Sequence, residues 1–143
     1  MSRAVEFKNV DIVFGDRTAE ALKMIDAGAN RSEILAKTGA VLGAAGASLA
    51  VEEGEISVLM GLSGSGKSTL LRAVNGLNKV ARGSVLVRHK GEMVDVVTCK
   101  PELLRQVRQG TVAMVFQQFG LLPWRTVREN VGLGLELAGL GPV

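Results

Sequence analysis

The sequence contains no tyrosine, one cysteine and few aromatic residues of any kind. Aromatic side chains make up 3% of the 143 residues, which leaves the core to Val, Leu, Ile, Ala and Met. Cys99 is the single cysteine and cannot form an internal disulfide, so we expect a reducing, cytoplasmic setting. The N-terminus has no basic segment followed by an apolar core and a small-residue cleavage site. The most apolar stretch, residues 40–51, is shorter than the roughly 20 residues that a membrane-spanning helix needs, so any membrane role would come through a partner.

The charge balance points to no particular partner. The chain has 17 basic and 14 acidic residues and a net charge of +3, without a long run of Lys or Arg interleaved with aromatics. This pattern argues against a dedicated nucleic-acid surface. Since 47% of the residues are apolar and 22% are charged, the chain can bury one core of ordinary domain size.

Hydrophobic periodicity predicts an α/β chain. Residues 4–14 alternate as in a half-buried strand that ends at the Gly15-Asp16 turn. Residues 18–38 are typical of a helical segment with a break at 27–30, a cap at Asn30 or Ser32, and an end at Gly39. The later pattern predicts further elements: strands at 47–51, 56–60 and 111–116, a helix after residue 66 that stops near Gly76, a hairpin of 83–88 and 93–97, and helices at 101–109 and, more weakly, 126–140.

A glycine-rich loop lies between the predicted strand 56–60 and the helix that follows it. The loop matches GxxxxGK(S/T) at every fixed position with Gly61, Leu62, Ser63, Gly64, Ser65, Gly66, Lys67 and Ser68. Glycines let the backbone curl so that its N–H groups form an anion nest at a helix N-terminus. Lys67 can reach the β- and γ-phosphates, the Ser68 hydroxyl can bind magnesium, and Thr69 can contact the α-phosphate. The alternative is a flexible Gly/Ser turn with a solvated lysine.

The loop alone does not choose among the classes of phosphate-loop proteins. A GTPase would need a guanine-reading NKxD and a DxxG switch. The nearest match, residues 78–81, lacks the aspartate, and no DxxG occurs in the sequence. A GTPase is therefore not expected.

Residues 115–127, VFQQFGLLPWRTV, resemble the glutamine-loop region of ABC transporter ATPases. The loop at 61–68 fits the same family, and Gln117 follows Lys67 by 50 residues. The resemblance implies that Gln117, in a glutamine loop of about 117–126, reaches the magnesium ion and the attacking water. Lys67 and Gln117 would then be the catalytic residues, and Ser68 and Gln117 the metal-binding residues, with ATP and Mg2+ as cofactors. The alternative for Gln117 is an ordinary polar residue that closes a strand.

Two other features take a role from this resemblance. Phe14 occupies the place of an aromatic residue that stacks on adenine, and stacking needs only a ring face. Phe14 also fits the apolar face of its strand, so packing in the core is the alternative. Residues 121–124 would border the groove that receives a coupling helix of the permease; a loop folded into the core is the alternative.

The helical insertion of residues 18–39, together with residues 50–56 (AVEEGEI) and 60–66 (MGLSGSG), resembles the ATPases of quaternary-amine importers for glycine betaine, proline betaine or choline. The resemblance implies a P-loop NTPase core with an N-terminal antiparallel β subdomain. It also implies an energy-coupling subunit that pairs with a second nucleotide-binding subunit and a transmembrane permease, on the inner face of the cell membrane. A substrate-binding protein would be an indirect partner, and no nucleic acid is expected.

Three family motifs are missing from the 143 residues: an LSGGQ signature, an apolar strand ending in Asp-Glu, and a later switch histidine. His89, the only histidine, follows a strand pattern between Arg88 and Lys90, and we expect it to be a solvated surface residue. Residues 1–143 are therefore expected to be the N-terminal part of one nucleotide-binding domain, poorly soluble and slow to hydrolyse ATP alone. Two alternatives stay open, a non-transport P-loop ATPase module and an inactive truncated product.

Overall fold

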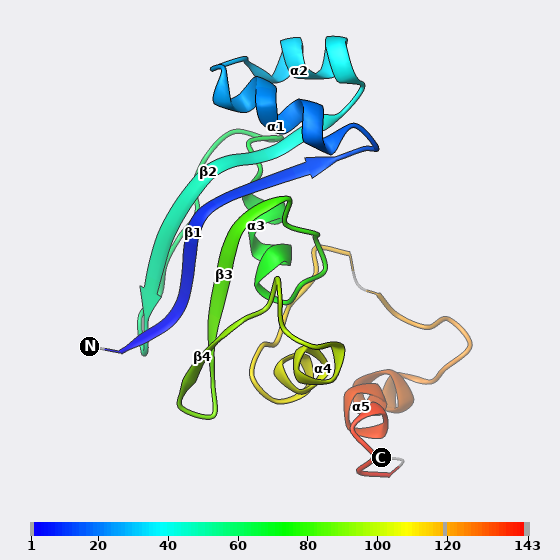
Figure 1. The fold of residues 1–143 in the computed structure, drawn as a ribbon. Coiled ribbons are helices and arrows are strands. Elements are labelled where there is room, and N and C mark those ends of the chain that lie inside the picture. The colour runs from blue at the N-terminus through cyan, green and yellow to red at the C-terminus, as the bar shows by residue number, and fades with distance from the viewer. Residues whose placement is uncertain (1, 119, 142–143) are drawn as a thin grey trace. The chain divides into compact units, whose positions relative to one another are not determined.

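The structure is a computed structural model that describes residues 2–118 and 120–141. Contacts within the chain divide it into two units, residues 1–112 and residues 113–143 (Figure 1). The first unit contains a sheet and four helices, and the second contains the last described helix. Within the described ranges, no helix has both the length and the apolar character needed to cross a membrane.

The N-terminal unit is built on a four-stranded antiparallel sheet with the strand order β2-β1-β3-β4. The strands are β1 (Arg3–Phe14), β2 (Val41–Glu52), β3 (Arg82–His89) and β4 (Glu92–Asp95). The helices are α1 (Thr18–Asp26), α2 (Arg31–Thr38), α3 (Lys67–Val74) and α4 (Pro101–Gly110). The antiparallel sheet and the broken helical insertion therefore agree with the sequence predictions. The strand predicted at 47–51 is the second half of a longer strand, since β2 begins at Val41.

Strand β1 departs from simple alternation. Asn9 has a φ of 47°, and the register with both neighbouring strands shifts between residues 7 and 13. Because of these bulges, residues 10–13 are all buried, including Asp11 at 1% exposure. The Asp11 carboxylate accepts hydrogen bonds from Gly46 N and from Arg82 Nε, both at 2.6 Å. A paired and hydrogen-bonded carboxylate can be buried at this depth.

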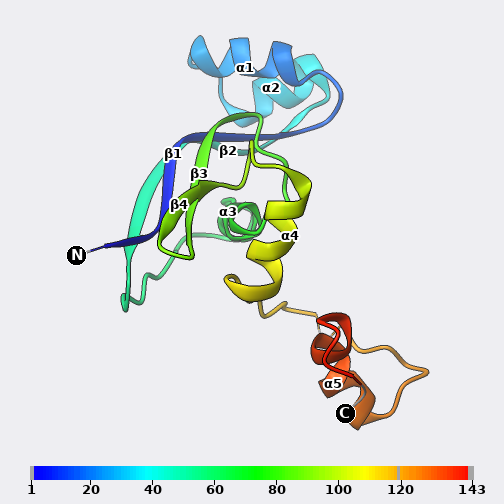
Figure 2. The ribbon, with the colours of Figure 1, turned by 60° about the horizontal axis from the view of Figure 1, so that its bottom comes forward.

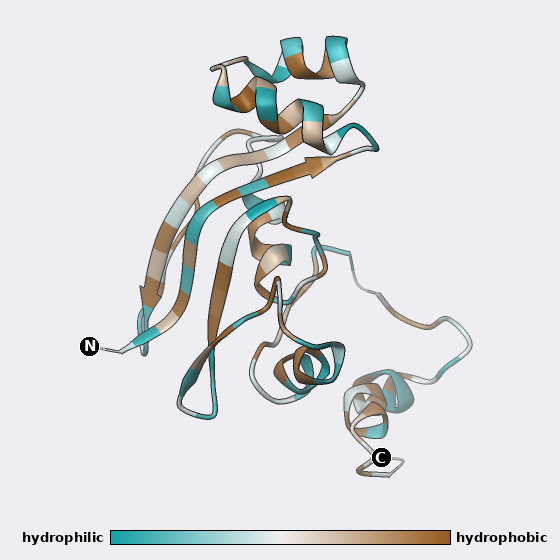
Figure 3. Cartoon of the chain, viewed as in Figure 1, coloured by the Kyte–Doolittle hydropathy of each residue, from teal (hydrophilic) through white to brown (hydrophobic). Residues whose placement is uncertain are grey.

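Two hydrophobic clusters hold the N-terminal unit together. In the larger one, α3 and α4 pack on the sheet through Ala73 and Val107. In the smaller one, α1 and α2 cover the region where β1 ends and β2 begins, with Ala21 and Ile34 fully buried. Figure 2 shows this pair of helices at one end of the sheet, away from α4, and Figure 3 shows hydrophilic and hydrophobic residues alternating around both helices. The insertion is thus an ordered part of the unit.

The strands predicted at 56–60 and 111–116 are wrong. Neither stretch is paired as a strand, and several of their apolar side chains are exposed, by 91% at Ile56 and 97% at Val115. A buried parallel strand needs neighbours that take up its backbone hydrogen bonds and cover its faces. In the part of the chain that the structure describes, neither stretch belongs to a strand of the sheet.

The expectation of a solvated His89 is also wrong. Along β3, the buried residues are Val85, Val87 and His89, which places the imidazole on the face of the sheet that packs against helices. The His89 side chain is 8% exposed, and its Nδ1 lies 2.6 Å from the hydroxyl of Thr111 at the end of α4. The prediction relied on the charged neighbours Arg88 and Lys90. Successive residues of a strand face opposite sides of the sheet, so charged neighbours do not imply an exposed His89.

Candidate functional site

The glycine-rich loop makes a tight turn at residues 63–66 and leads directly into α3. Gly61, Gly64 and Gly66 have φ values of 153°, 78° and 100°, in a region that side chains other than glycine disfavour. At Gly66, an added Cβ would lie only 2.3 Å from the carbonyl oxygen of Gly43 in β2. The loop therefore passes so close to the sheet that only glycine fits at this point.

The Lys67 ammonium group lies over the loop. Its Nζ donates hydrogen bonds to the carbonyls of Gly61 and Leu62, at 2.7 and 2.8 Å, and to Ser65 Oγ at 3.3 Å. No carboxylate pairs with this lysine in the described residues. The ammonium group is therefore held near the curl of the backbone with no opposing negative charge.

The first turn of α3 leaves hydrogen-bond donors free. Gly66 caps the helix without a side-chain hydrogen bond, and the first turn has no acidic residue. The N–H groups of Lys67, Ser68 and Thr69 have no acceptor within residues 2–118 and 120–141, as expected for the start of a helix. Free amides, a positive helix end and an unpaired ammonium group fit an anion such as a polyphosphate.

The exposed hydroxyl of Ser68 is the metal-binding candidate on α3. It makes no hydrogen bond to the described part of the chain. Across that same part, no group of three or more His, Cys, Asp or Glu side chains could hold a metal ion. A magnesium ion would fit only as the partner of phosphate oxygens, with the hydroxyl as one further oxygen ligand.

Phe14 lies beside the beginning of α3. Its side chain is 41% exposed at the end of β1 and belongs to neither hydrophobic cluster. A Cβ on Gly43 would lie 2.8 Å from the Phe14 ring and 2.9 Å from the methyl group of Thr69, so the ring and Thr69 are neighbours. This exposure argues against packing in the core. Part of the ring is accessible beside Thr69.

One side chain that the sequence analysis did not single out also reaches the loop. Arg31, the first residue of α2, donates hydrogen bonds to backbone carbonyls of the loop and of β2. No local pattern could have found it, because the contact joins residues more than thirty positions apart.

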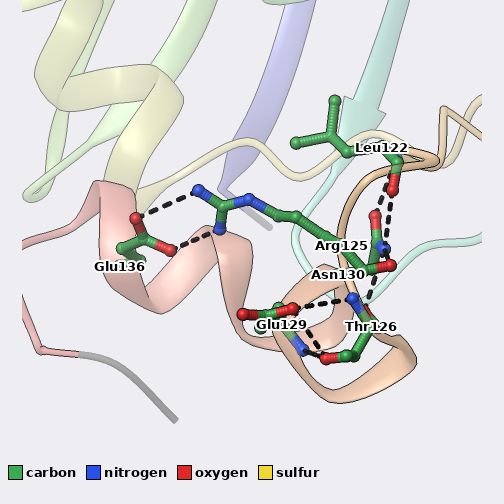
Figure 4. Close-up of polar contacts among 6 residues, drawn as sticks. All are labelled: Leu122, Arg125, Thr126, Glu129, Asn130 and Glu136. Carbon is green, nitrogen blue, oxygen red and sulfur yellow. Dashed lines mark hydrogen bonds and ion pairs between the residues drawn. The ribbon is translucent and has the colours of Figure 1, made fainter.

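The C-terminal unit contains Gln117 and α5 (Val127–Leu137). Gln117 lies in a bend and is exposed, so it does not close a strand. Phe119, within the expected glutamine loop, lies outside the described residues. The stretch before α5 is closed by Asn130, whose amide accepts from Leu122 N at 2.8 Å and donates to three backbone carbonyls, at Leu122, Arg125 and Thr126 (Figure 4).

Charged groups fix the ends of α5. Thr126 and Glu129 form a capping box, and the hydrogen bonds from the Thr126 backbone N–H and hydroxyl hold the pKa of the Glu129 carboxyl below its usual range. Arg125 pairs with Glu136 at 2.5 Å, which lowers the pKa of the Glu136 carboxyl and raises that of the guanidinium (Figure 4).

Apolar side chains of this unit surround a groove of about 290 Å³. Its lining comprises Leu121, Leu122, Pro123, Arg125, Val127, Asn130 and Val131. Leu121 and Trp124 are 66% and 76% exposed, which argues against a loop folded into the core. Residues 121–123 of the predicted 121–124 thus line this groove, whereas Trp124 is not among its lining residues.

Comparisons with known proteins agree with this geometry. The ABC transporter family pattern matches residues 44–139. The chain is 47% identical over 140 residues to the glycine betaine/proline betaine transport system ATP-binding protein ProV of Escherichia coli, and 40% identical over 136 residues to the glycine betaine/carnitine transport ATP-binding protein GbuA of Listeria monocytogenes. These matches cover 98% and 95% of the chain but only 34% and 33% of the two relatives, so the chain spans about a third of their length.

A solved structure is similar as well. It is a dimeric post-hydrolysis state of the ATP-binding cassette MJ0796 bound to ADP and Pi, and the match has a TM-score of 0.70 at 27% sequence identity. The match covers 97% of the chain and 50% of the cassette.

Proposed function

The chain belongs to the ABC transporter family, and from this premise we propose that it binds ATP with magnesium as part of a subunit that couples ATP hydrolysis to transport. Residues 1–143 would form the N-terminal part of one nucleotide-binding domain. The family membership, the loop geometry and the likeness to a cassette bound to ADP and Pi support this proposal.

In the proposed site, each residue has a defined task. The free backbone amides at the start of α3 bind phosphate oxygens, and Lys67 exchanges its carbonyl partners for the β- and γ-phosphates. Thr69 contacts the α-phosphate, and Phe14 stacks on the adenine through the accessible part of its ring. Magnesium, held by Ser68, with Gln117 as the second proposed protein ligand, would neutralise charge that develops on the phosphates.

The observation that carries the proposal is the Lys67 ammonium group, which has no carboxylate partner in the described residues and lies beside the free amides of α3. Calorimetry with MgATP tests it, comparing the wild-type chain with Lys67→Ala. Lys79→Ala is the matched control, because Lys79 is exposed and makes no hydrogen bond or ion pair within the described residues. We expect uptake by the wild type and the control and a loss of at least tenfold in Lys67→Ala, since charged hydrogen bonds contribute about 1.5–3 kcal/mol each. Equal uptake by all three would refute the proposal.

We further propose that the transported solute is a quaternary amine such as glycine betaine, because the relatives named above are transport subunits for glycine betaine and related solutes. A second nucleotide-binding subunit, a permease and a substrate-binding protein would be the partners, on the inner face of the cell membrane. The groove at residues 121–131 would meet the permease. Uptake of labelled glycine betaine into cells that express the whole system, lost when Lys67→Ala or Gln117→Ala is introduced, tests this part.

Hydrolysis by the 143 residues alone is expected to be very slow. They contain no apolar strand that ends in Asp-Glu and no signature sequence. A steady-state ATPase assay of the purified chain, with Lys67→Ala as the blank, should give no rate above that blank. Turnover typical of a working ATPase would contradict this expectation.

A further inference from the structure

Arg31 joins three parts of the N-terminal unit. It is the first residue of α2, and its Nη1 donates a hydrogen bond to the Gly64 carbonyl at 2.7 Å. Its Nη2 donates to the carbonyls of Ser65 and of Gly43 in β2, both at 3.2 Å. One guanidinium group thus connects the helical insertion, the sheet and the phosphate loop.

The two loop contacts fix the orientation of two successive peptide groups. In a planar trans peptide, the carbonyl and the following N–H point in opposite directions. With the Gly64 and Ser65 carbonyls turned toward Arg31, the N–H groups of Ser65 and Gly66 must point away from it. The Ser65 N–H accordingly donates to the Leu62 carbonyl of the same loop, at 3.2 Å. An anion nest requires such inward amides.

Arg31 is presented from a well-packed helix end. Asn30 caps α2 through a reciprocal pair of hydrogen bonds with Glu33, at 3.0 and 2.8 Å. Ile34, one turn later, is fully buried in the cluster shared by α1, α2 and the sheet. The guanidinium group is therefore held by a capped helix instead of a free loop.

Arg31 also has no negative partner. Seven ion pairs occur among the described residues, and none includes Arg31 or Lys67. Two cations consequently bind the carbonyls of one loop, Lys67 at Gly61 and Leu62, and Arg31 at Gly64 and Ser65. Carbonyl dipoles compensate these charges only in part, and a bound polyphosphate would complete the compensation.

We propose that Arg31 is a positioning residue of the nucleotide site, which holds the phosphate loop with its amides inward and makes the helical insertion a determinant of nucleotide affinity. This inference rests on the proposed nucleotide binding. Arg31 contacts the carbonyls of the loop and thereby orients its amides. We therefore expect Arg31 to affect the affinity for the phosphates and not the affinity for the base.

The test compares Arg31→Met and Arg31→Lys with wild type, using MgATP, MgADP and magnesium pyrophosphate as separate probes in calorimetry. Arg17→Met is the matched control, because Arg17 directly precedes the same insertion but donates to the Lys37 carbonyl at 3.0 Å and pairs with Glu20. Removal of Arg31 should weaken all three probes by a similar factor of about tenfold, the equivalent of one charged hydrogen bond. Arg31→Lys should recover part of the affinity, and Arg17→Met should bind like wild type.

Amide hydrogen exchange and thermal melting complete the test. In Arg31→Met, exchange at residues 63–66 should rise while the melting temperature stays with that of Arg17→Met. Wild-type affinity of Arg31→Met for pyrophosphate, with binding still lost in Lys67→Ala, would overturn the role of Arg31 and leave the proposed function intact. A loss of affinity that Arg31→Lys does not relieve, together with a melting temperature well below that of Arg17→Met, would show a merely structural role and overturn it too. Absence of uptake by the wild-type chain would refute the proposed function, and the role of Arg31 with it.

Discussion

The close approach of Gly66 to β2 gives a quantitative test of the loop geometry. Gly66→Ala adds a Cβ at a φ of 100° and at 2.3 Å from the Gly43 carbonyl oxygen. Gly64→Ala is the matched control, because it adds a Cβ at a φ of 78° with no heavy atom within 4 Å. Both variants place a side chain at a positive φ, but only in Gly66→Ala does the new Cβ overlap the Gly43 carbonyl oxygen.

The expected losses follow from these two terms. A non-glycine residue in a left-handed conformation costs about 1–2 kcal/mol. For Gly64→Ala this corresponds to a loss of MgATP affinity by a factor of about 5–30. Relief of the overlap in Gly66→Ala moves the backbone by about 0.7 Å, from 2.3 Å to the 3.0 Å below which Cβ contacts essentially do not occur. Such a shift takes an N–H···O bond out of its normal range, so at least one charged hydrogen bond, worth about a further tenfold, is lost.

Calorimetry with MgATP measures both variants, and thermal melting checks that each remains folded. Relief of the overlap moves the loop away from the shape that the proposed phosphate site needs, so the strain should appear mainly as lost affinity. Gly66→Ala should therefore bind at least tenfold more weakly than Gly64→Ala at a similar melting temperature. Equal affinities of two folded variants would refute the claim that contact with β2 sets the shape of the loop.

Three other predictions concern residues around and beyond the loop. Phe14→Ala should weaken MgATP about tenfold in calorimetry and leave pyrophosphate binding unchanged, since stacking of a base on an aromatic ring contributes about 1–3 kcal/mol; equal losses for both ligands would contradict it. The hydrogen bond from Arg82 holds the pKa of Asp26 below its usual value of 3.8, so its stabilising effect is present above that pH and is lost as the pH falls below it. The difference in melting temperature between wild type and Asp26→Asn should accordingly shrink below pH 4, and a constant difference would count against the pair. Asn130→Ala removes the acceptor of Leu122 N, and hydrogen exchange at that amide should rise by about tenfold, a change that Glu136→Gln should not produce.

Local sequence patterns determined much of this protein. The phosphate loop, the break between α1 and α2 with its cap at Asn30, and the left-handed Gly39 all follow from residue types at short spacing. These features depend on backbone conformation and on hydrogen bonds within a few residues, which a short segment can specify by itself. Family membership came from the same local motifs.

Only the tertiary structure decided the remaining features, because each depends on contacts between distant segments. The bulges of β1 bury Asp11 against Arg82, and the strand register turns His89 inward, although neighbouring charges suggest an exposed residue. The stretch around Ile56 has the composition of a strand but lacks pairing partners in the described chain. Arg31 reaches the loop only because α2 packs across the end of the sheet. A sequence specifies which groups can bind, whereas packing determines which of them meet.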